Sequence, residues 1–450
     1  MVRAMERRMK QEQRGESGGS NESSGKDTFA VSAPSVNLPK GGGAIRGMGE
    51  KFGANPVTGT GSLTVPIATS PGRSGFGPQL ALSYDSGAGN GPFGLGWNLS
   101  LPSITRKTDK GLPKYFDAEE SDIFILSGAE DLVPVLINNK GRWERQPFDS
   151  PTSEPGYSVQ RYRPRTEGLF ARIERWTDKN SGISHWRSIS KDNITTLYGK
   201  RPDARIADPA DAARIFSWLI CESFDDKGNA ILYGYKPEDA NNVDPTAPHE
   251  INRLIAKQFP QRYLKQVRYG NRAPRQTGDD LTTRDDWLFE VMLDYGEHDQ
   301  AIPTTKELRT WPVRQDPFSE FRATFDVRTY RLCRRVLMFH HFPDELDGTA
   351  DYLVRSTDFE YKESSVASFI ASVTQSGYAQ QPDKSYLKKS LPKLEFKYTD
   401  VKVDETVHEI DSESIKNLPY GVDGSRYQWV DLESEGLTGV LTEQADAWYY

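Results

Sequence analysis

The sequence predicts an all-β protein with large curved antiparallel sheets, and three observations carry this prediction. Apolar and polar residues alternate in segments such as "GSLTVPIAT" (61–69) and "FGPQLALSYDS" (76–86), which is the period of a half-buried strand. Glycine, asparagine, aspartate and proline recur between such segments as turn residues. Long helical patterns are missing, which argues against a fold of alternating strands and helices.

Composition and charge exclude several classes of protein. The 450 residues are enough for two or three domains. A net charge of -7 and a pI near 5.6 provide no general basic field for nucleic acid. No run of about 18 apolar residues occurs, and residues 1–30 lack the apolar core of a secretory signal. Cys221 and Cys333 are too few for a disulfide framework and lie in no zinc spacing.

Composition also divides the chain into parts. Residues 1–40 mix charged residues with serine and glycine, which predicts a disordered arm, with a short amphipathic helix over 2–13 as the alternative. Residues 41–385 carry the recurring strand-and-turn pattern. The polar, breaker-rich segment 374–392 marks a boundary, and we expect residues 386–450 to form a linker and an incomplete last unit.

The glycine-rich segment "SGAGNGPFGLGWNLSLP" (86–102) follows the first two predicted strands and contains a G-x-G-x-x-G spacing. In dinucleotide-binding loops a helix must follow the glycines, because its N-terminus holds the pyrophosphate. Here residues 95–101 alternate as a second strand, and Pro92 removes a backbone donor. The sequence therefore predicts a hairpin turn rather than a phosphate loop.

The later segments follow the same pattern. The strongest hairpin signal spans Ile215 to Tyr235, with residues 225–229 ("DDKGN") as the turn. The segment "RTYRLCRRVLMFHHFP" (328–343) is expected to be one long strand. Only residues 209–214 and 365–371 favour short helices.

Two clusters in this region invite a chemical interpretation. His340 and His341 are adjacent and would point to opposite faces of a strand, so they cannot share one metal. Four arginines lie nearby, and we expect ordinary ion pairing with the acidic excess, with binding of an acidic partner as the alternative. These arginines are Arg328, Arg331, Arg334 and Arg335. No H-E-x-x-H, G-x-S-x-G or Walker-type motif occurs.

The acidic segment "WVDLESEGLTGVL" (429–441) has the spacing of a calcium loop. Asp431, Glu433 and Glu435 alternate before a glycine, as oxygen ligands do in such loops. The glutamates are long for this role, and Gly439 stands where another acid would close the cage, so a plain acidic turn is the alternative. Glu433 and Glu435 also form the E-x-E pattern of arginine-specific ADP-ribosyltransferases. These enzymes also need an upstream Ser-Thr-Ser strand, and no such strand precedes the two glutamates within a plausible distance. We expect no catalytic residue and no cofactor.

Several long segments resemble one known family. They are "LPKGGGAIRGMGEKF" (38–52), "LGWNLSLPSITRKTDKGLPKY" (95–115), "DIFILSGAEDLVPV" (122–135), "YLKQVRYGNR" (263–272) and "DWLFEVMLDYGEHD" (286–299). Together they resemble the opening of SpvB-type virulence proteins and of the B subunits of Tc insecticidal toxins. Residues 419–450 resemble the region of Tc B subunits where a β-propeller begins, which favours the Tc type.

The resemblance implies a role that the residues alone do not. In Tc toxins the B and C subunits form a hollow β-shell of RHS-type repeats around an unfolded toxic segment, and the propeller docks on the pore-forming A subunit. The resemblance therefore implies an RHS-like shell portion over 41–385 and a linker followed by an incomplete FG-GAP/VCBS-like propeller region over 386–450. The implied partners are a C subunit and an A subunit, without nucleic acid or a membrane segment. Secretion without a recognisable signal peptide, after a stage in the bacterial cytoplasm, is also implied.

Three functional hypotheses follow. The first is a non-catalytic structural part of a toxin-delivery shell. The second is a carbohydrate- or receptor-binding β-module, supported by aromatic residues such as Trp143, Trp176 and Trp186, which are more often core residues. The third is an SpvB-like virulence protein whose ADP-ribosyltransferase activity lies in a missing C-terminal part.

Overall fold

The structure is a computed structural model that divides the chain into two compact units, Met1–Phe396 and Lys397–Tyr450. It describes the chain from residue 48 to residue 450 except for residues 49, 55–59, 128–130, 146–147, 150–154, 167, 255–258, 347, 400–405, 408, 410, 412, 414–425, 433–437 and 445–446. The arm expected over residues 1–40 lies outside the described residues.

A closed barrel of eight antiparallel strands forms one part of the first unit. Each strand in the series hydrogen-bonds to the next, and the last strand pairs again with the first. The series is β5 (Ser103–Arg106), β6 (Phe124–Leu126), β7 (Asp131–Pro134), β11 (Tyr157–Pro164), β12 (Arg172–Asp178), β13 (Ser184–Ile189), β14 (Thr195–Tyr198) and β16 (Asp211–Phe224).

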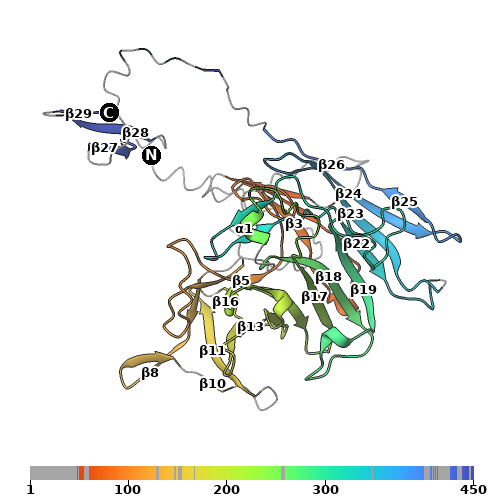
Figure 1. Cartoon of the computed structure of the whole chain (residues 1–450). Coiled ribbons are helices and arrows are strands. Elements are labelled where there is room, and N and C mark those ends of the chain that lie inside the picture. The colour runs from red at the N-terminus through yellow and green to blue at the C-terminus, as the bar shows by residue number, and fades with distance from the viewer. Residues whose placement is uncertain are drawn as a thin grey trace, which may run out of the picture. The chain divides into compact units, whose positions relative to one another are not determined.

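The barrel continues directly into a large twisted sheet (Figure 1). Strand β16 is 14 residues long, and its last residues, 222–224, also pair with β17. Antiparallel pairing then runs from β17 through β24, which pairs with both β25 and β26. The strands are β17 (Ala230–Pro237), β18 (Arg262–Asn271), β19 (Trp287–Asp294), β22 (Arg335–His340), β23 (Tyr352–Lys362), β24 (Phe369–Gln380), β25 (Tyr386–Ser390) and β26 (Leu394–Glu395).

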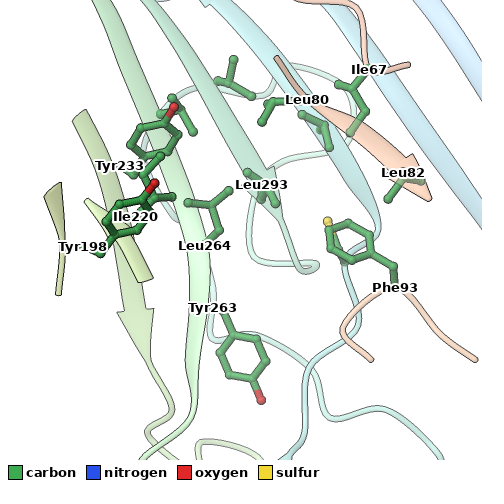
Figure 2. Packing of buried hydrophobic residues seen from close by; sticks show 14 of the residues in the cluster. Ile67, Leu80, Leu82, Phe93, Tyr198, Ile220, Tyr233, Tyr263, Leu264 and Leu293 are labelled. Atoms are coloured by element: carbon green, nitrogen blue, oxygen red, sulfur yellow. The ribbon is translucent and has the colours of Figure 1, made fainter. Parts of the chain in front are cut away.

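A separate four-stranded sheet packs on a face of this large sheet. It consists of β1 (Lys51–Ala54), β2 (Gly61–Pro66), β3 (Ala81–Asp85) and β4 (Trp97–Leu99). Figure 2 shows Ile67, Leu80 and Leu82 of this layer on the same core as Leu264 and Leu293 of the large sheet. The alternation that predicted β2, β3 and β4 thus gives each of these three strands one apolar face for a common core, whereas Phe52 of β1 is exposed.

The remaining elements of the first unit are short. They are the hairpin β8 (Leu136–Asn139)–β9 (Arg142–Arg145), β10 (Phe148–Asp149), β15 (Arg205–Asp208), the pair β20 (Phe318–Glu320)–β21 (Val327–Thr329), the helix α1 (Ile251–Leu254), and 3₁₀ turns at Arg73–Gly75, Pro202–Ala204 and Leu281–Thr283. The second unit contains the antiparallel sheet β27 (Tyr427–Val430), β28 (Gly439–Gln444) and β29 (Ala447–Tyr449).

The all-β prediction with large antiparallel sheets is confirmed. The predicted hairpins at 86–102 and 215–235 are also present, as β3–β4 and β16–β17. The two short helices are not present: Ala210 lies in a turn and Asp211 begins β16, while Phe369 begins β24. Repeated tertiary pairing overrides weak local helix preference at these points.

The expected long strand over 328–343 is also wrong. It is divided into β21 and β22, and residues 330–334 between them belong to neither strand. The reason is that this backbone bonds elsewhere: the Cys333 amide donates to the Pro92 carbonyl at 2.8 Å, and the Arg314 amide donates to the Tyr330 carbonyl at 2.9 Å. The boundary expected at residue 386 falls at the start of β25, a strand of the first unit's large sheet.

No helix among the described residues is long and apolar enough to cross a membrane.

Candidate functional site

The glycine-rich segment that raised the phosphate question forms a loop anchored inside the protein. Arg314 donates from Nη1 to the Gly91 carbonyl at 2.7 Å, and Asn90 donates from Nδ2 to Asp316 Oδ2 at 2.9 Å. Gly94 has a φ of +87°, and a Cβ there would lie 2.5 Å from the carbonyl oxygen of Ser368. The glycines therefore allow a close approach of two backbone segments, not the approach of a nucleotide.

Asp316 is the acceptor at the centre of this anchor. Its carboxylate pairs with Arg314 at 2.7 Å, and both side chains are buried. Burial alone would raise the pKa of Asp316, but hydrogen bonds from Arg314, Ser368 and Asn90 outweigh burial and hold the pKa below its usual value. This carboxylate is ionised and fully engaged, so it stabilises the loop.

The barrel interior is filled by aromatic rings. Phe124, Tyr162, Trp186 and Trp218 come from four different strands and contact one another at centroid distances of 4.9–6.0 Å. Arg106 lies fully buried beside them and pairs with Asp117 at 2.6 Å and with Asp122 at 2.7 Å. An eight-stranded barrel is just wide enough to be filled in this way. Its interior is a packed core, not a channel.

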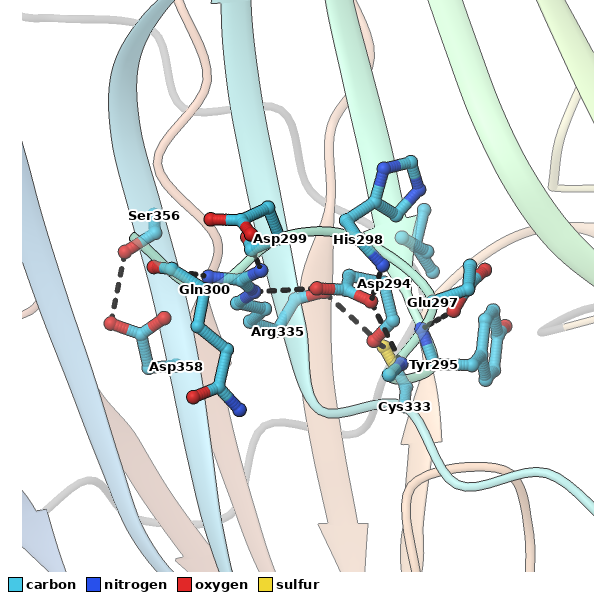
Figure 3. A network of polar contacts seen from close by, with 12 residues as sticks. Asp294, Tyr295, Glu297, His298, Asp299, Gln300, Cys333, Arg335, Ser356 and Asp358 are labelled. Atoms are coloured by element: carbon cyan, nitrogen blue, oxygen red, sulfur yellow. Dashed lines mark hydrogen bonds and ion pairs between the residues drawn. The ribbon is translucent and has the colours of Figure 1, made fainter. Parts of the chain in front are cut away.

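A group of buried ionisable side chains lies where β19 ends (Figure 3). Ligand atoms of Asp294, Glu297 and His298 lie within 4.8 Å of one another, a spacing compatible with a cation. Two cationic side chains already occupy these carboxylates: Arg335 contacts Asp294 at 2.5 Å, and Lys265 pairs with Glu297. The donor set is used within the protein, and a metal ion would have to displace a buried lysine and a partly buried arginine.

His298 completes this network. Its Nδ1 faces the carbonyls of Thr304 and Lys306 at 2.9 and 3.1 Å, so Nδ1 carries the proton. Its Nε2 then accepts from Lys265 Nζ at 2.8 Å. Burial and the Lys265 charge lower the pKa of His298. The neutral ring holds the segment after β19 on the sheet.

Sequence reasoning did not single out this network. The nearest signal is the run "DYGEHD" (294–299), because it places Asp294, Glu297 and His298 at and just after the end of a strand. Its partners Lys265 and Arg335 come from β18 and β22, and only strand pairing brings them to the same place.

The predicted ion pairing of the four arginines is what the structure contains. Each contacts a different carboxylate, from Glu250, Glu238, Glu363 and Asp294 in the order of the arginines along the chain. Arg331 also lies over the Trp311 ring, 4.5 Å from its centroid. The alternative, in which these arginines bind an acidic partner, loses its support because their charges are used internally.

The two adjacent histidines are separated as expected. His340 contacts Ser70 Oγ at 2.7 Å, whereas His341 contacts Glu290 at 3.1 Å and Asp351 at 3.3 Å. Burial alone would lower the pKa of His341, but the hydrogen bonds to Asp351 and Glu290 raise the pKa to about 10. His341 is therefore protonated at neutral pH, and its contacts with Glu290 and Asp351 link β19 to the loop before β23.

The aromatic residues that suggested glycan binding are mostly core residues. Trp176 and Trp186 are buried, and Trp143 on the β8–β9 hairpin is 67% exposed. Cys221 and Cys333 are both buried free thiols, and burial raises the pKa of the Cys221 thiol to about 11. A buried protonated thiol is unreactive.

The predicted calcium loop is only partly described. Asp431 is half-buried directly after β27, while Glu433 and Glu435 lie outside the described residues. Calcium binding by these three residues, like the E-x-E interpretation of the two glutamates, therefore remains a prediction.

Comparison with known proteins decides the family. The sequence profile described as SpvB, Salmonella virulence plasmid 65kDa B protein, matches residues 55–342. The chain belongs to the SpvB family. Mono(ADP-ribosyl)transferase SpvB of Salmonella typhimurium (strain 14028s / SGSC 2262) is 39% identical over 347 residues, which are 75% of this chain and 56% of that protein. The SpvB protein of Salmonella dublin matches to the same extent. This SpvB-family chain thus spans little more than half the length of these relatives.

Solved structures extend the likeness of this SpvB-family chain. The N-terminal domain of effector protein SpvB from Salmonella typhimurium strain LT2 matches with a TM-score of 0.63 and 38% identity, covering 70% of this chain and 98% of that chain. The crystal structure of TcdB2-TccC3 matches with a TM-score of 0.76 and 34% identity, covering 93% of this chain and 20% of that chain. The Photorhabdus luminescens Tc holotoxin pore gives a TM-score of 0.75 and covers 94% of this chain.

These likenesses support a structural role related to toxins or virulence for this SpvB-family chain. They do not show catalytic activity for the region that this chain represents.

Proposed function

We propose that this chain is a non-catalytic structural part of a Tc-type toxin complex, forming part of the β-shell that encloses a toxic effector. The observation that carries the proposal is the extent of the fold match. The SpvB N-terminal domain covers 70% of the chain, whereas TcdB2-TccC3 covers 93% at a higher TM-score. The chain therefore continues beyond the SpvB domain in the way that the Tc protein does.

The interior chemistry supports a wall element. The barrel is filled by aromatic rings, and the buried charges of the Asp294 network are paired with one another. A domain with this interior has a rigid, close-packed core, and its continuous sheet can transmit strain along its length. The partners in this proposal are a C subunit with an RHS-repeat shell and a toxic C-terminus, and a pore-forming A subunit. Residues 386–450 would form a linker and the beginning of the propeller, and the assembly would be exported from the cell.

A chimera tests the shell role. Residues 48–396 of this chain would replace the matching segment of TcdB2 in TcdB2-TccC3, and a second chimera would carry the SpvB N-terminal domain instead. We expect the first chimera to protect the hypervariable C-terminal region of TccC3 from protease as the unaltered complex does. The proposal fails if the chimera is soluble and that region is digested as fast as after denaturation. An insoluble chimera also counts against it if the second chimera assembles.

The second candidate is an SpvB-like virulence protein whose transferase lies outside this chain. It is favoured by the 39% identity to mono(ADP-ribosyl)transferase SpvB, of which the chain spans 56%. Under both candidates this purified chain releases no nicotinamide from NAD, because the second candidate places the transferase outside it. Measurable release that Glu433→Gln and Glu435→Gln abolish would place a transferase within this chain and contradict both candidates.

A further inference from the structure

Three residues on adjacent strands place two positive charges on either side of a glycine. Arg355 of β23 lies directly opposite Gly377 of β24, and Gly377 lies directly opposite Lys389 of β25. Residues that are directly opposite in neighbouring strands project from the same face of the sheet. Because strands lie about 4.8 Å apart, the two cationic residues start about 10 Å from each other across the glycine.

A groove of about 360 Å³ runs over these three residues. Its lining residues are Ala68, Arg355, Ser356, Gln375, Ser376, Gly377, Lys389, Ser390 and Leu391. A Cβ built on Gly377 would meet nothing within 4 Å, so the glycine forms an open floor. One wall is the segment that follows β2, which is held on this face because Gln375 donates from Nε2 to the Pro66 carbonyl at 2.9 Å. We call this feature the cationic groove.

The charges of the cationic groove are not neutralised by the part of the chain that the structure describes. Arg355 and Lys389 are both exposed, and no carboxylate belongs to the lining residues. The neighbouring lysines behave differently: Lys388 pairs with Asp358 at 3.0 Å, and Lys393 lies 3.5 Å from Glu360. Lys388 projects from the opposite face of β25, so its ion pair lies away from the groove, and the two cations inside the groove remain available.

The shape and donors of the groove distinguish between classes of anion. The amide groups of the strands at its floor belong to the ladders between β23, β24 and β25, so the backbone supplies no nest for a single phosphate. Only two long, flexible side chains carry charge, and Leu391 and Ala68 add apolar surface. In an extended peptide alternate side chains lie about 7 Å apart on one face. Two such carboxylates can be reached by Arg355 and Lys389 together.

We propose that the cationic groove binds an acidic extended segment of a partner polypeptide. Carboxylates of the segment pair with Arg355 and Lys389 over Gly377, and apolar side chains between them lie against Leu391. The site does not depend on the proposed shell function, since it is defined by this chain's own strands. Its contacts are exposed ion pairs, so binding weakens as salt is raised.

A labelled peptide tests the proposal on the full 450-residue chain. The probe is a fluorescein-labelled peptide in which glutamate and valine alternate, and the readout is fluorescence anisotropy at low and at physiological ionic strength. We expect saturable binding that weakens with salt. Arg355→Glu and Lys389→Glu each replace an attraction by a repulsion, so each should weaken binding about tenfold. Gly377→Val should weaken it similarly, because a β-branched side chain fits a strand but fills the floor.

Matched controls separate the groove from general charge and from misfolding. Lys110→Glu makes the same charge change at an exposed position away from the groove, and Ala379→Val makes a similar size change on the same face of β24 outside the lining. Both should bind as the unaltered chain does, and all variants should keep its circular dichroism spectrum.

Several outcomes would overturn the proposal. They are the absence of saturable binding, equal binding of a glutamine–valine peptide, and equal losses in the Lys110 and Lys389 variants. Displacement of the peptide by inorganic phosphate at the peptide's own concentration would also overturn it, because it would indicate a small-anion site. A chimera that fails to protect TccC3 would leave this result unaffected, so the two proposals fail separately.

Discussion

Trp186 and Trp218 lie edge to face inside the barrel, with their ring centroids 6.0 Å apart and an interplanar angle of 78°. They belong to β13 and β16, which are separated in the barrel by β14. Trp218 also donates from Nε1 to the Ser184 carbonyl at 2.8 Å. Phe124 contacts both rings. These contacts connect strands through the barrel interior, independently of the hydrogen-bond ladder.

Removing one of these rings should therefore destabilise the barrel. We expect Trp218→Ala to lower the free energy of unfolding by about 3–5 kcal/mol, because it removes a buried ring and leaves a cavity. Trp143→Ala is the control, since that ring is 67% exposed and its loss should change stability by less than about 0.5 kcal/mol. Urea unfolding followed by circular dichroism measures both. Equal midpoints for the two variants would contradict a packed barrel core.

Two glycines of the same loop should respond differently to alanine. Gly94→Ala forces a side chain onto a φ of +87° and against the Ser368 carbonyl, which should destabilise the protein by roughly 1–3 kcal/mol. A Cβ on Gly89 meets nothing within 4 Å, and Gly89→Ala should have little effect. Thermal unfolding of the two variants provides the comparison. Equal unfolding temperatures for the two variants would contradict the close approach at Gly94.

His185 should make the first unit less stable in mild acid. Its side chain is buried against Tyr157 and Trp176, and burial together with the charges of Lys200 and Arg205 lowers its pKa from 6.5 to about 3. The unfolded chain then binds the proton more tightly, so stability is lost as the pH falls below 6.5. At pH 5 the loss amounts to about 2 kcal/mol.

The matched variant for this prediction is His185→Phe, which keeps an aromatic ring at the site but cannot titrate. The unaltered chain should lose more stability than the variant between pH 7 and pH 5, as measured by urea unfolding at each pH. Parallel pH profiles would show that His185 does not contribute.

His341 should act at the opposite end of the pH range. Its pKa is raised to about 10 by the hydrogen bonds to Asp351 and Glu290. The folded state then binds the proton more tightly, so the stabilisation is fully present below pH 6.5 and is lost as the pH rises through 10. His341→Gln should lower the melting temperature at pH 7 and have a smaller effect at pH 10. An equal effect at both pH values would contradict the ion-pair account.

The second unit should promote self-association. Trp429, Leu432, Trp448 and Tyr450 are exposed on or beside its three-stranded sheet, and exposed apolar residues at strand edges favour association. Deleting Lys397–Tyr450 should reduce association in sedimentation velocity and leave the first unit folded. The deletion begins after Phe396 because the Phe396 ring packs in the core, with its centroid 5.0 Å from the centroid of the Trp97 ring. A clean monomer of the full chain at high concentration would contradict this prediction.

Much of the fold could be predicted because its signals are local. The alternation around Leu63 and Val65 lies within one strand, and the turn chemistry of residues 225–229 lies within one hairpin. The signals failed where distant groups competed for the backbone. Residues 330–334 look like a strand, yet Cys333 bonds to Pro92 of the glycine-rich loop instead of to a neighbouring strand.

The candidate sites were less predictable than the fold. The acidic run at 431–435 was found from spacing alone, but two of its three residues lie outside the described structure. The Asp294 network and the cationic groove were not found, since each joins residues from at least three strands. The spacing of residues within one segment cannot predict a cluster of side chains that come from several strands.

By itself, the sequence determined the strand character of the chain, the hairpin at the glycine-rich loop and the likeness to SpvB and Tc proteins, because periodicity, turn residues and family segments are all read along the chain. Only the tertiary structure decided that β16 pairs back to β5, where Ser217 meets Thr105, and so closes the barrel. It also decided which charges are paired and which remain in the groove. The physical reason is that hydrogen bonds, cavities and ion pairs between distant strands depend on register, and register is set by packing of the whole sheet.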